Sequence, residues 1–326
     1  MEGTGKMKRY TIHSLATTSA LREEADGSLI ARPSINSFKD KILCGDASAT
    51  LATIPDTSVQ SIITSPPYFQ QRDYGTGNYQ VGGEDSPEKY IQKLVGIFKE
   101  CSRVLKPNGL MWLNLGDKFI DGVLLGLPWR VAIALQQAGW ILRCDIIWHK
   151  PNAMPHSVKT RPTVDHEYVF MFSKSADYFY DADAIREPHV TFSENSRMKG
   201  GRNHFGKRNG TPEVGKNCGN NNLHDGRWDQ AFHPLGRNKR TVWNIPLSKY
   251  RGAHFAVFPE KLVENCVLAS TKPSDVVLDP FAGSGTVGVV AAKFQRSFVL
   301  IELNKEYCQL IEKRLNGNQM ELIAKC

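Results

Sequence analysis

Four residues, Ser65, Pro66, Pro67 and Tyr68, end an apolar segment at residues 59–64. Two consecutive prolines have no N–H to donate to a sheet and cannot continue a helix. The Ser65 hydroxyl and the carbonyls of Ser65 and Pro66 are therefore held in set directions as hydrogen-bond acceptors. Such acceptors suit an amine that must lose a proton, and the Tyr68 ring offers a face for a planar group. We interpret these residues as a cradle for an exocyclic amino group, with a plain surface turn as the alternative.

A second chemical motif, "DVVLDPFAGSGTVGVVAAKF", occupies residues 275–294. It predicts a strand that ends at Asp279, a turn with two glycines, and a helix that begins near Thr286. The glycines let the backbone approach a ligand, and a helix N-terminus favours polar or anionic groups. The next predicted strand, "SFVLIE", ends on Glu302, whose carboxylate can accept hydrogen bonds from both hydroxyls of a ribose.

The order of strand, glycine turn, helix, strand and acidic residue predicts a site for an adenosine-containing cofactor. A tight turn beside a solvated glutamate is the alternative. A nicotinamide cofactor is disfavoured, because the turn lacks the third spaced glycine of the GxGxxG pattern.

Strands and helices alternate along most of the chain and must position these two motifs. Strands are expected at 41–45, 59–64, 110–116, 140–149, 166–174, 276–280 and 297–303, a turn at 106–109, and helices at 47–55, 87–105, 127–138, 259–270, from 286, and 305–315. This alternation predicts an α/β fold with a doubly wound, mostly parallel Rossmann-like sheet. The two close strands at 140–149 and 166–174 predict an antiparallel hairpin at one edge. Because ligands bind at the carboxyl ends of such strands, Ser65 and the glycine turn are expected at the same rim.

The positive charge of the chain is concentrated in one segment. The net charge is +8, and residues 196–240 contain ten Lys and Arg residues against three acidic ones. This excess predicts a polyanionic partner, with a solvated loop as the alternative. Residues 175–240 also break the alternation, and a structureless loop of this length is rare within a compact domain, so we expect an insertion. The candidate contacts to this polyanion are Arg202, Lys207, Arg208, Arg237, Lys239 and Arg240.

Composition excludes several classes of protein. No apolar run reaches the length of a membrane span, and the first residues lack the apolar stretch of a signal peptide. The seven cysteines show neither CxxC nor Cys/His pairs at zinc-ligand spacing, so neither disulfides nor a metal site are expected. We therefore expect an intracellular, cytoplasmic protein without a membrane anchor.

Together, "TSPPY", "DPFAGSG", "FVLIEL" and "HFAVFPEKLVENCV" resemble the amino-methylating DNA methyltransferases, which use S-adenosylmethionine. The cradle precedes the glycine turn in the chain, as in the circularly permuted beta-type members. The resemblance covers residues 39–174 and 241–316. It implies a permuted methyltransferase sheet divided into an N-terminal arm (1–36), a catalytic half (37–174), a target-recognition insertion (175–240) and a cofactor-binding half (241–326).

The resemblance also implies roles for single residues. Ser65, Pro66, Pro67 and Tyr68 would receive the target base, and Glu302 would hold the ribose. The remaining cofactor contacts that it implies are Asp46, Phe258, Pro259, Asp279, Pro280, Phe281, Gly283, Ser284, Gly285 and Thr286. Asp46 would be the acid on the adenine side. It belongs to the strand that would pair with the one ending at Glu302. Phe258 and Pro259 would belong to a helix that covers the cofactor.

The target would be a base in double-stranded DNA, flipped out of the duplex so that its amino group is accessible. In the family, a corner that begins with Ser accompanies cytosine N4, and adenine N6 is the alternative. No Pro-Cys dipeptide occurs, which argues against C5-cytosine methylation because that chemistry needs a thiolate nucleophile. Methylation of RNA or of a glutamine side chain, or a non-catalytic DNA-binding protein, are further alternatives. The resemblance allows a cognate restriction endonuclease and a homodimer as further partners.

Overall fold

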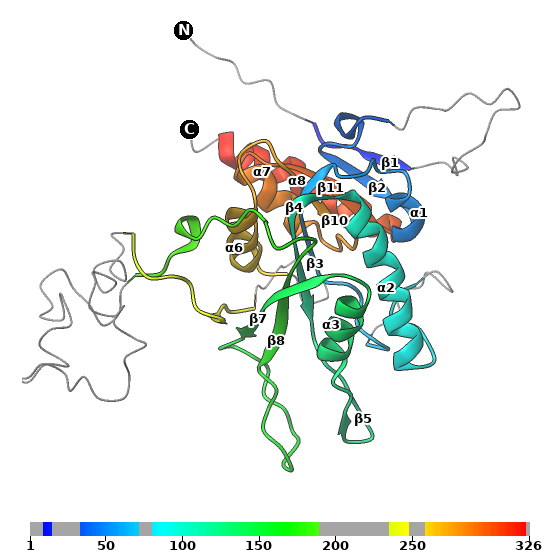
Figure 1. Ribbon diagram of the computed structural model, residues 1–326, viewed down its shortest axis with the longest axis vertical. Helices are drawn as coiled ribbons and strands as arrows, with labels where there is room; N and C mark the ends of the chain where they lie inside the picture. Colours follow the sequence, from blue (N-terminus) through cyan, green and yellow to red (C-terminus); the bar gives the residue numbers. More distant parts are fainter. Residues whose placement is uncertain (1–8, 15–32, 72–79, 189–234, 248–257, 324–326) are drawn as a thin grey trace, which may run out of the picture. The chain divides into compact units, whose positions relative to one another are not determined.

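The computed structural model describes residues 9–14, 33–71, 80–188, 235–247 and 258–323 (Figure 1). The chain divides into two compact units, one formed by residues 1–180 with 241–326 and the other by residues 181–240. The larger unit carries the sheet and its covering helices. Among the described residues, no helix is both long enough and apolar enough to cross a membrane.

Nine strands of the described chain form one sheet, in the order β1-β2-β11-β10-β3-β4-β8-β7-β9. Their bounds are β1 Ile12–Ser14, β2 Lys41–Cys44, β3 Val59–Thr64, β4 Leu105–Leu115, β7 Ile141–His149, β8 His166–Ser173, β9 Val242–Asn244, β10 Val276–Asp279 and β11 Ser297–Glu302. The run from β1 to β4 is parallel throughout. β8 is antiparallel to both of its neighbours, β4 and β7. The predicted mixed, mostly parallel sheet is therefore confirmed.

The edges of the sheet differ from the sequence-based expectation. The antiparallel β7–β8 hairpin is present, but it does not form the edge, because β9 pairs in parallel outside β7. At the opposite edge β1 extends the sheet beside β2, although it lies in the segment expected to be an arm. Each of these two strands has only three residues, too few to show the alternation by which a strand is recognised.

Helices cover both faces of the sheet. The helices α1 Ala47–Leu51, α2 Pro87–Val104 and α3 Leu127–Gln137 lie on one side, and α6 Glu260–Ser270, α7 Thr286–Lys293 and α8 Lys305–Ile323 on the other (Figure 1). The short elements are the 3-10 turns η1 Ile35–Ser37 and η3 Asp183–Ile185 and a small ribbon of β5 Phe119–Ile120 with β6 Val123–Leu124. With helices on both faces, the central strands β3 and β10 are buried at every residue, as parallel sheets require.

Successive side chains of a strand serve opposite layers. Ile62, Leu278 and Val299 belong to the core cluster that includes α1, α2 and α3. On the other face, the buried Trp112 donates its indole N–H to the Ser270 hydroxyl of α6 at 3.1 Å. Because side chains alternate along a strand, each strand helps to bury both helical layers.

Two element boundaries differ from the prediction. The expected turn at 106–109 lies inside β4 as an irregularity, where the pairing jumps from Val59↔Leu105 to Ser61↔Leu110. The turn residues are accommodated as extra residues in β4. The pairing of β4 with β3 therefore continues in a new register beyond them. The last helix continues to Ile323, past the expected end at residue 315.

Candidate active site

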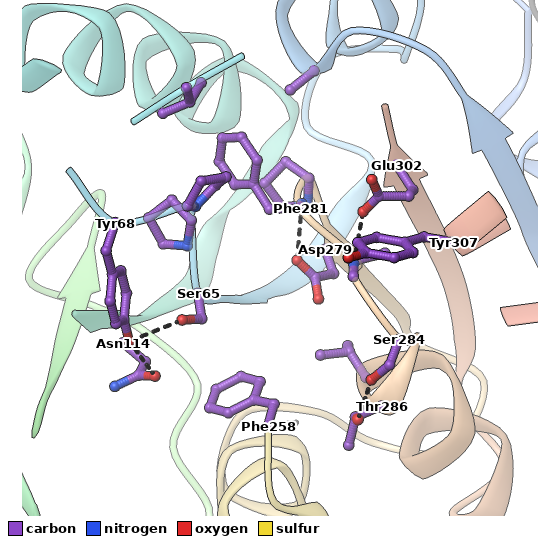
Figure 2. A pocket seen from close by; sticks show the side chains of 18 of the residues that line it. Ser65, Tyr68, Asn114, Phe258, Asp279, Phe281, Ser284, Thr286, Glu302 and Tyr307 are labelled. Atoms are coloured by element: carbon purple, nitrogen blue, oxygen red, sulfur yellow. Dashed lines mark hydrogen bonds between the residues drawn. The ribbon is translucent and has the colours of Figure 1, made fainter. Parts of the chain in front are cut away.

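One cavity of about 240 Å³ lies at the carboxyl ends of β3, β4, β10 and β11 (Figure 2). Most of the residues expected to do chemistry lie in its wall: Asp46, Ser65, Pro66, Pro67, Tyr68, Phe258, Asp279, Pro280, Phe281, Gly283, Ser284, Thr286 and Glu302. Residues far apart in the chain meet there because parallel strands end at a common rim. Pro259 and Gly285 do not line the cavity.

The ends of β3 and β10 are joined through the buried carboxyl group of Asp279. Its Oδ1 accepts hydrogen bonds from the Thr64 hydroxyl at 2.7 Å and from the Phe281 N–H at 3.0 Å. β3 and β10 are adjacent parallel strands, so the proline corner and the glycine turn follow side by side. The expectation that both lie at one rim is confirmed.

The glycine turn between β10 and α7 contains two residues in the left-handed region. Gly283 has φ 52° and Gly285 has φ 76°. A Cβ on Gly285 would come within 2.7 Å of the Ile311 side chain of α8. Gly285, expected beside the cofactor, also allows α8 to pack closely against the turn. Pro259 is the residue immediately before α6, where its missing N–H costs no helical hydrogen bond.

Glu302 ends β11 and faces the glycine turn. Its Oε2 accepts the Gly283 N–H at 2.8 Å, and its Oε1 accepts the Asn304 N–H at 2.9 Å. Burial is the main cause that raises the pKa of Glu302 to about 7. Burial likewise raises the pKa of Asp279 to about 7, and the negative charge of Glu302 adds to that shift. Two carboxyl groups that titrate near neutrality therefore lie in one cavity wall.

Asp46 follows β2 and is the N-cap residue of α1. Its Oδ1 accepts the Ala49 N–H at 2.9 Å, so it caps the helix. β2 pairs in parallel with β11, and Cys44 lies opposite Glu302. The predicted pairing of these two strands is confirmed, and it brings Asp46 into the wall near Glu302.

A cluster of polar side chains surrounds the Tyr68 hydroxyl; we call it the Tyr68 cluster, formed by Ser65, Tyr68, Asn114, Lys150 and Glu167. The Tyr68 oxygen lies 3.2 Å from the Ser65 hydroxyl, 3.2 Å from the Asn114 carbonyl oxygen and 2.7 Å from Glu167 Oε2. Lys150 forms an ion pair with the other oxygen, Glu167 Oε1. Figure 2 shows Ser65, Tyr68 and Asn114 together on one side of the cavity, opposite Glu302.

Asn114, Lys150 and Glu167 all line the cavity, but none was among the sequence-based candidates. Asn114 is the polar residue in the otherwise apolar stretch "LMWLNL", which was an available signal. The sequence signal for Glu167 was weaker, because the position of Glu167 at the rim depends on β8 running antiparallel to β4. Gly116 completes the arrangement, since a Cβ there would come within 2.7 Å of the Tyr68 ring.

Arg314 is a further residue that sequence reasoning missed, and it fixes the glycine turn from behind. Its buried guanidinium donates to the Ser284 carbonyl at 3.2 Å, to the Thr286 hydroxyl at 2.9 Å and to Glu260 of α6 at 3.1 Å. One side chain of α8 thus ties the turn to α6. A planar guanidinium suits this task because it presents several donors in a fixed geometry.

Arg314→Met is expected to lower the free energy of unfolding by about 2–3 kcal/mol, because hydrogen bonds from a charged donor are lost and their acceptors stay buried. Urea unfolding followed by circular dichroism measures this change. Lys313→Met is the matched control, since Lys313 is the exposed neighbour on the same helix. Equal stability of the two variants would contradict the assigned role of Arg314.

All six candidate DNA contacts belong to the smaller unit, residues 181–240. Arg202, Lys207 and Arg208 lie outside the described residues. In the described part of this unit, Glu187 forms an ion pair with Arg237 at 3.2 Å and another with Lys239 at 3.4 Å. The backbones of Glu187 and Arg237 also exchange two hydrogen bonds. Part of the positive charge that the sequence indicates at positions 237 and 239 is therefore balanced within the unit.

A doubly wound sheet with a glycine turn, a facing acid and a polar corner at one rim is typical of proteins that bind a nucleotide-containing ligand. The sequence model of the N6_N4_Mtase family, described as DNA methylase, matches residues 59–313. The type II methyltransferase M.Cfr9I of Citrobacter freundii is 41% identical over 308 residues, which cover 86% of this chain and 88% of that protein. The chain therefore belongs to the N6/N4 DNA methylase family and is a type II DNA amino-methyltransferase.

Solved structures show the same fold. PvuII DNA methyltransferase (cytosine-N4-specific) superimposes with a TM-score of 0.60 at 21% identity, covering 86% of this chain and 90% of that one. TTHA0409 from Thermus thermophilus, solved in complex with S-adenosyl-L-methionine, superimposes with a TM-score of 0.54 at 26% identity, covering 85% of this chain and 93% of that one.

Proposed function

We propose that this enzyme transfers a methyl group from S-adenosylmethionine to the N4 amino group of a cytosine flipped out of duplex DNA. The observation that carries this proposal is the joining of the Ser65–Tyr68 corner and the Asp279–Glu302 side in one cavity. One side offers fixed acceptors for an amine, and the other offers carboxylates and a helix N-terminus for a nucleotide. The choice of cytosine over adenine is supported by Ser at the first position of the corner.

S-adenosylmethionine is the cofactor, and it supplies an electrophilic methyl group bonded to a positively charged sulfur. The residues of the cavity fit it. Glu302 would accept hydrogen bonds from the ribose hydroxyls, and Asp46 would lie on the adenine side. Phe258 and Phe281 supply apolar surface to cover it. Both carboxylates and the nearby Asp279 favour a ligand that carries positive charge.

On the target side, the corner holds and orients the base. The Tyr68 ring would stack on it, while the Ser65 hydroxyl oxygen and the Pro66 carbonyl accept hydrogen bonds from its amino group. These bonds favour a pyramidal nitrogen whose lone pair points at the methyl group. The nitrogen would then take the methyl group in line with the breaking C–S bond, which leaves a neutral thioether, and the methylated nitrogen would lose one proton to solvent. Positioning and electrostatics would supply most of the acceleration. Flipping is required, because a paired base offers no accessible lone pair.

Target recognition is assigned to residues 175–240, where the positive charge concentrates. Arg and Lys side chains can pair with guanine edges or phosphates, and Asn side chains with adenine edges. In a restriction–modification system, the same recognition sequence would be shared with an endonuclease. We propose that the methylation made here protects DNA from such an enzyme.

The product nucleoside tests the choice of base. Plasmid DNA from a methylation-free host, incubated with the enzyme and labelled cofactor, is expected to yield labelled N4-methyldeoxycytidine after digestion. Parallel reactions with RNA and with a bulk protein substrate are expected to remain unlabelled. Labelled N6-methyldeoxyadenosine as the product would overturn the assignment to cytosine and leave amino-methylation of DNA intact.

A further inference from the structure

The direction of the hydrogen bonds in the Tyr68 cluster can be worked out from the donors available. Tyr68 has one hydroxyl hydrogen and three acceptors within reach: Glu167 Oε2 at 2.7 Å, the Asn114 carbonyl oxygen at 3.2 Å and the Ser65 hydroxyl oxygen at 3.2 Å. The carboxylate is the nearest acceptor and the charged one, so it takes the hydrogen. An ionised carboxylate has no hydrogen to give back. The Tyr68–Glu167 bond can therefore run in only one direction.

The rest of the cluster keeps Glu167 in that acceptor state. Lys150 forms an ion pair with its Oε1, and both side chains are largely buried, with 15% and 16% of their surface exposed. The Asn114 amide donates to Glu167 Oε2 at 3.0 Å and to the Tyr168 carbonyl at 3.1 Å. Because its amide hydrogens are used in this way, the side chain of Asn114 is held with its carbonyl oxygen toward Tyr68. Burial and the charge of Glu167 also raise the pKa of Tyr68, so its hydroxyl stays protonated and remains a donor.

With its own hydrogen given to Glu167, the Tyr68 oxygen is left with lone pairs. It lies 3.2 Å from the Ser65 hydroxyl, which then is the donor in that pair. A hydroxyl whose hydrogen points away from a ligand offers that ligand only lone pairs. Ser65 would otherwise be free to rotate and to present its hydrogen to the target, where it would repel the hydrogens of an amine.

We propose that Glu167 is a positioning residue: through Tyr68 it directs the Ser65 hydrogen away from the target, so that a lone pair of Ser65 faces the amine. The inference rests on the proposed role of Ser65 as acceptor, and it holds for a cytosine or an adenine target. Ser65 donates to Tyr68 and Tyr68 donates to Glu167, while Lys150 holds the Glu167 carboxylate in an ion pair. It adds a specificity for amino groups, because a carbonyl at the same place in the base would meet the Ser65 lone pair.

The test is a set of single-turnover methyl-transfer rates with saturating labelled cofactor and methylation-free plasmid DNA. Glu167→Gln keeps the size of the side chain but adds an amide that can donate to Tyr68 and reverse the order. Tyr68→Phe keeps the ring and removes the link. Each variant is expected to slow transfer about tenfold, the worth of one misdirected buried hydrogen bond. Dissociation constants for S-adenosylhomocysteine and for DNA are expected to stay within about twofold, since the change concerns hydrogen-bond direction.

The double variant Tyr68→Phe/Glu167→Gln separates positioning from a merely structural effect. Both changes break one series of bonds, so the double variant is expected to be slowed about tenfold and not about a hundredfold. Glu88→Gln is the control, because that carboxylate pairs with Arg130 away from the cavity. Its transfer rate is expected to equal that of the wild type.

Other outcomes overturn the inference. A Glu167→Gln variant at the wild-type rate, multiplicative losses in the double variant, or binding constants that weaken as much as the rate would each contradict positioning through Tyr68. Ser65→Ala in the same assay keeps the two proposals apart. If it is inactive while Glu167→Gln is fully active, the acceptor role of Ser65 stands and the role of Glu167 falls. If Ser65→Ala is fully active, the proposed acceptor itself is wrong.

Discussion

Ser65→Ala is expected to lower the rate constant for methyl transfer by about a hundredfold, the effect of removing one fixed acceptor at a reacting centre. The hydroxyl lies at the rim of β3, and the two prolines that follow hold it there. It lies 3.2 Å from the Tyr68 oxygen, on the side of the cavity opposite Glu302 (Figure 2). The affinity for S-adenosylmethionine is therefore expected to change less than about twofold, because the residues proposed to hold the cofactor are unchanged.

The matched control for this substitution is Ser58→Ala. Ser58 lies just before the same strand, at the opposite end, where its hydroxyl donates to the Pro55 carbonyl at 2.6 Å. Single-turnover rates on methylation-free plasmid DNA, with cofactor affinity from calorimetry, measure both variants. Equal rates for Ser65→Ala and Ser58→Ala would remove Ser65 from the chemistry. Loss of cofactor binding with Ser65→Ala would instead show that the substitution disturbs the whole rim.

The affinity for S-adenosylmethionine is expected to rise about a hundredfold between pH 6 and pH 8, as two cavity carboxyls lose their protons. Burial raises the pKa of Asp279 and of Glu302 to about 7. The bound cofactor brings positive charge at sulfur and hydroxyl donors at the ribose, and both favour ionised carboxylates. Binding therefore lowers these pKa values, and near pH 7 it releases about one proton in total.

The effect of these two carboxyl groups on the stability of the fold itself has the opposite dependence on pH. Both folded-state pKa values lie above the ordinary values of 3.8 and 4.5, so the protonated groups are favoured in the fold. Their contribution to stability is present below those ordinary values and is lost as the pH rises through about 7. The cofactor is thus expected to raise the melting temperature more at pH 8 than at pH 6, because it stabilises the ionised groups.

Calorimetry in buffers of different ionisation enthalpy measures the released protons, and thermal shifts measure the stability. Glu302→Gln is expected to weaken binding about tenfold at pH 8 and to flatten the pH dependence. Glu306→Gln is the matched control, since Glu306 is exposed in the first turn of α8. A cofactor affinity independent of pH in the wild type, or a pH dependence unchanged by Glu302→Gln, would contradict the assignment.

Much of the scaffold was predictable because its signals are local. β3 begins and ends as expected, since both of its faces are buried and a double proline follows it. Helix α2 begins where Ser86 and Pro87 indicate, with the Ser86 side chain accepting the Lys89 N–H. The glycine turn was equally plain. Strands of three residues, such as β1 and β9, carry no such signal, and only their neighbours in the sheet make them strands.

The completion of the Tyr68 cluster was not predictable, because Asn114, Lys150 and Glu167 are distant in the chain from the predicted Ser65 and Tyr68. Asn114 and Glu167 are 53 residues apart, and they meet only because β8 runs antiparallel to β4. Lys150 follows β7, whose place beside β8 brings it to the same carboxylate. Arg314 reaches the glycine turn from α8 in the same way, through the packing of one helix. Charged and polar residues of this kind look like surface positions in a linear pattern.

The sequence by itself determined the two motifs, the order of the elements between them and the chemistry that their residue types allow. Turn geometry and strand periodicity depend on neighbours in the chain, so these could be read directly. Only the tertiary structure decided which distant side chains complete the cavity and in which direction their hydrogen bonds run. It also showed that Gly285 packs against Ile311 of α8. The reason is physical: the pairing of strands and the packing of helices bring together residues that no local rule connects.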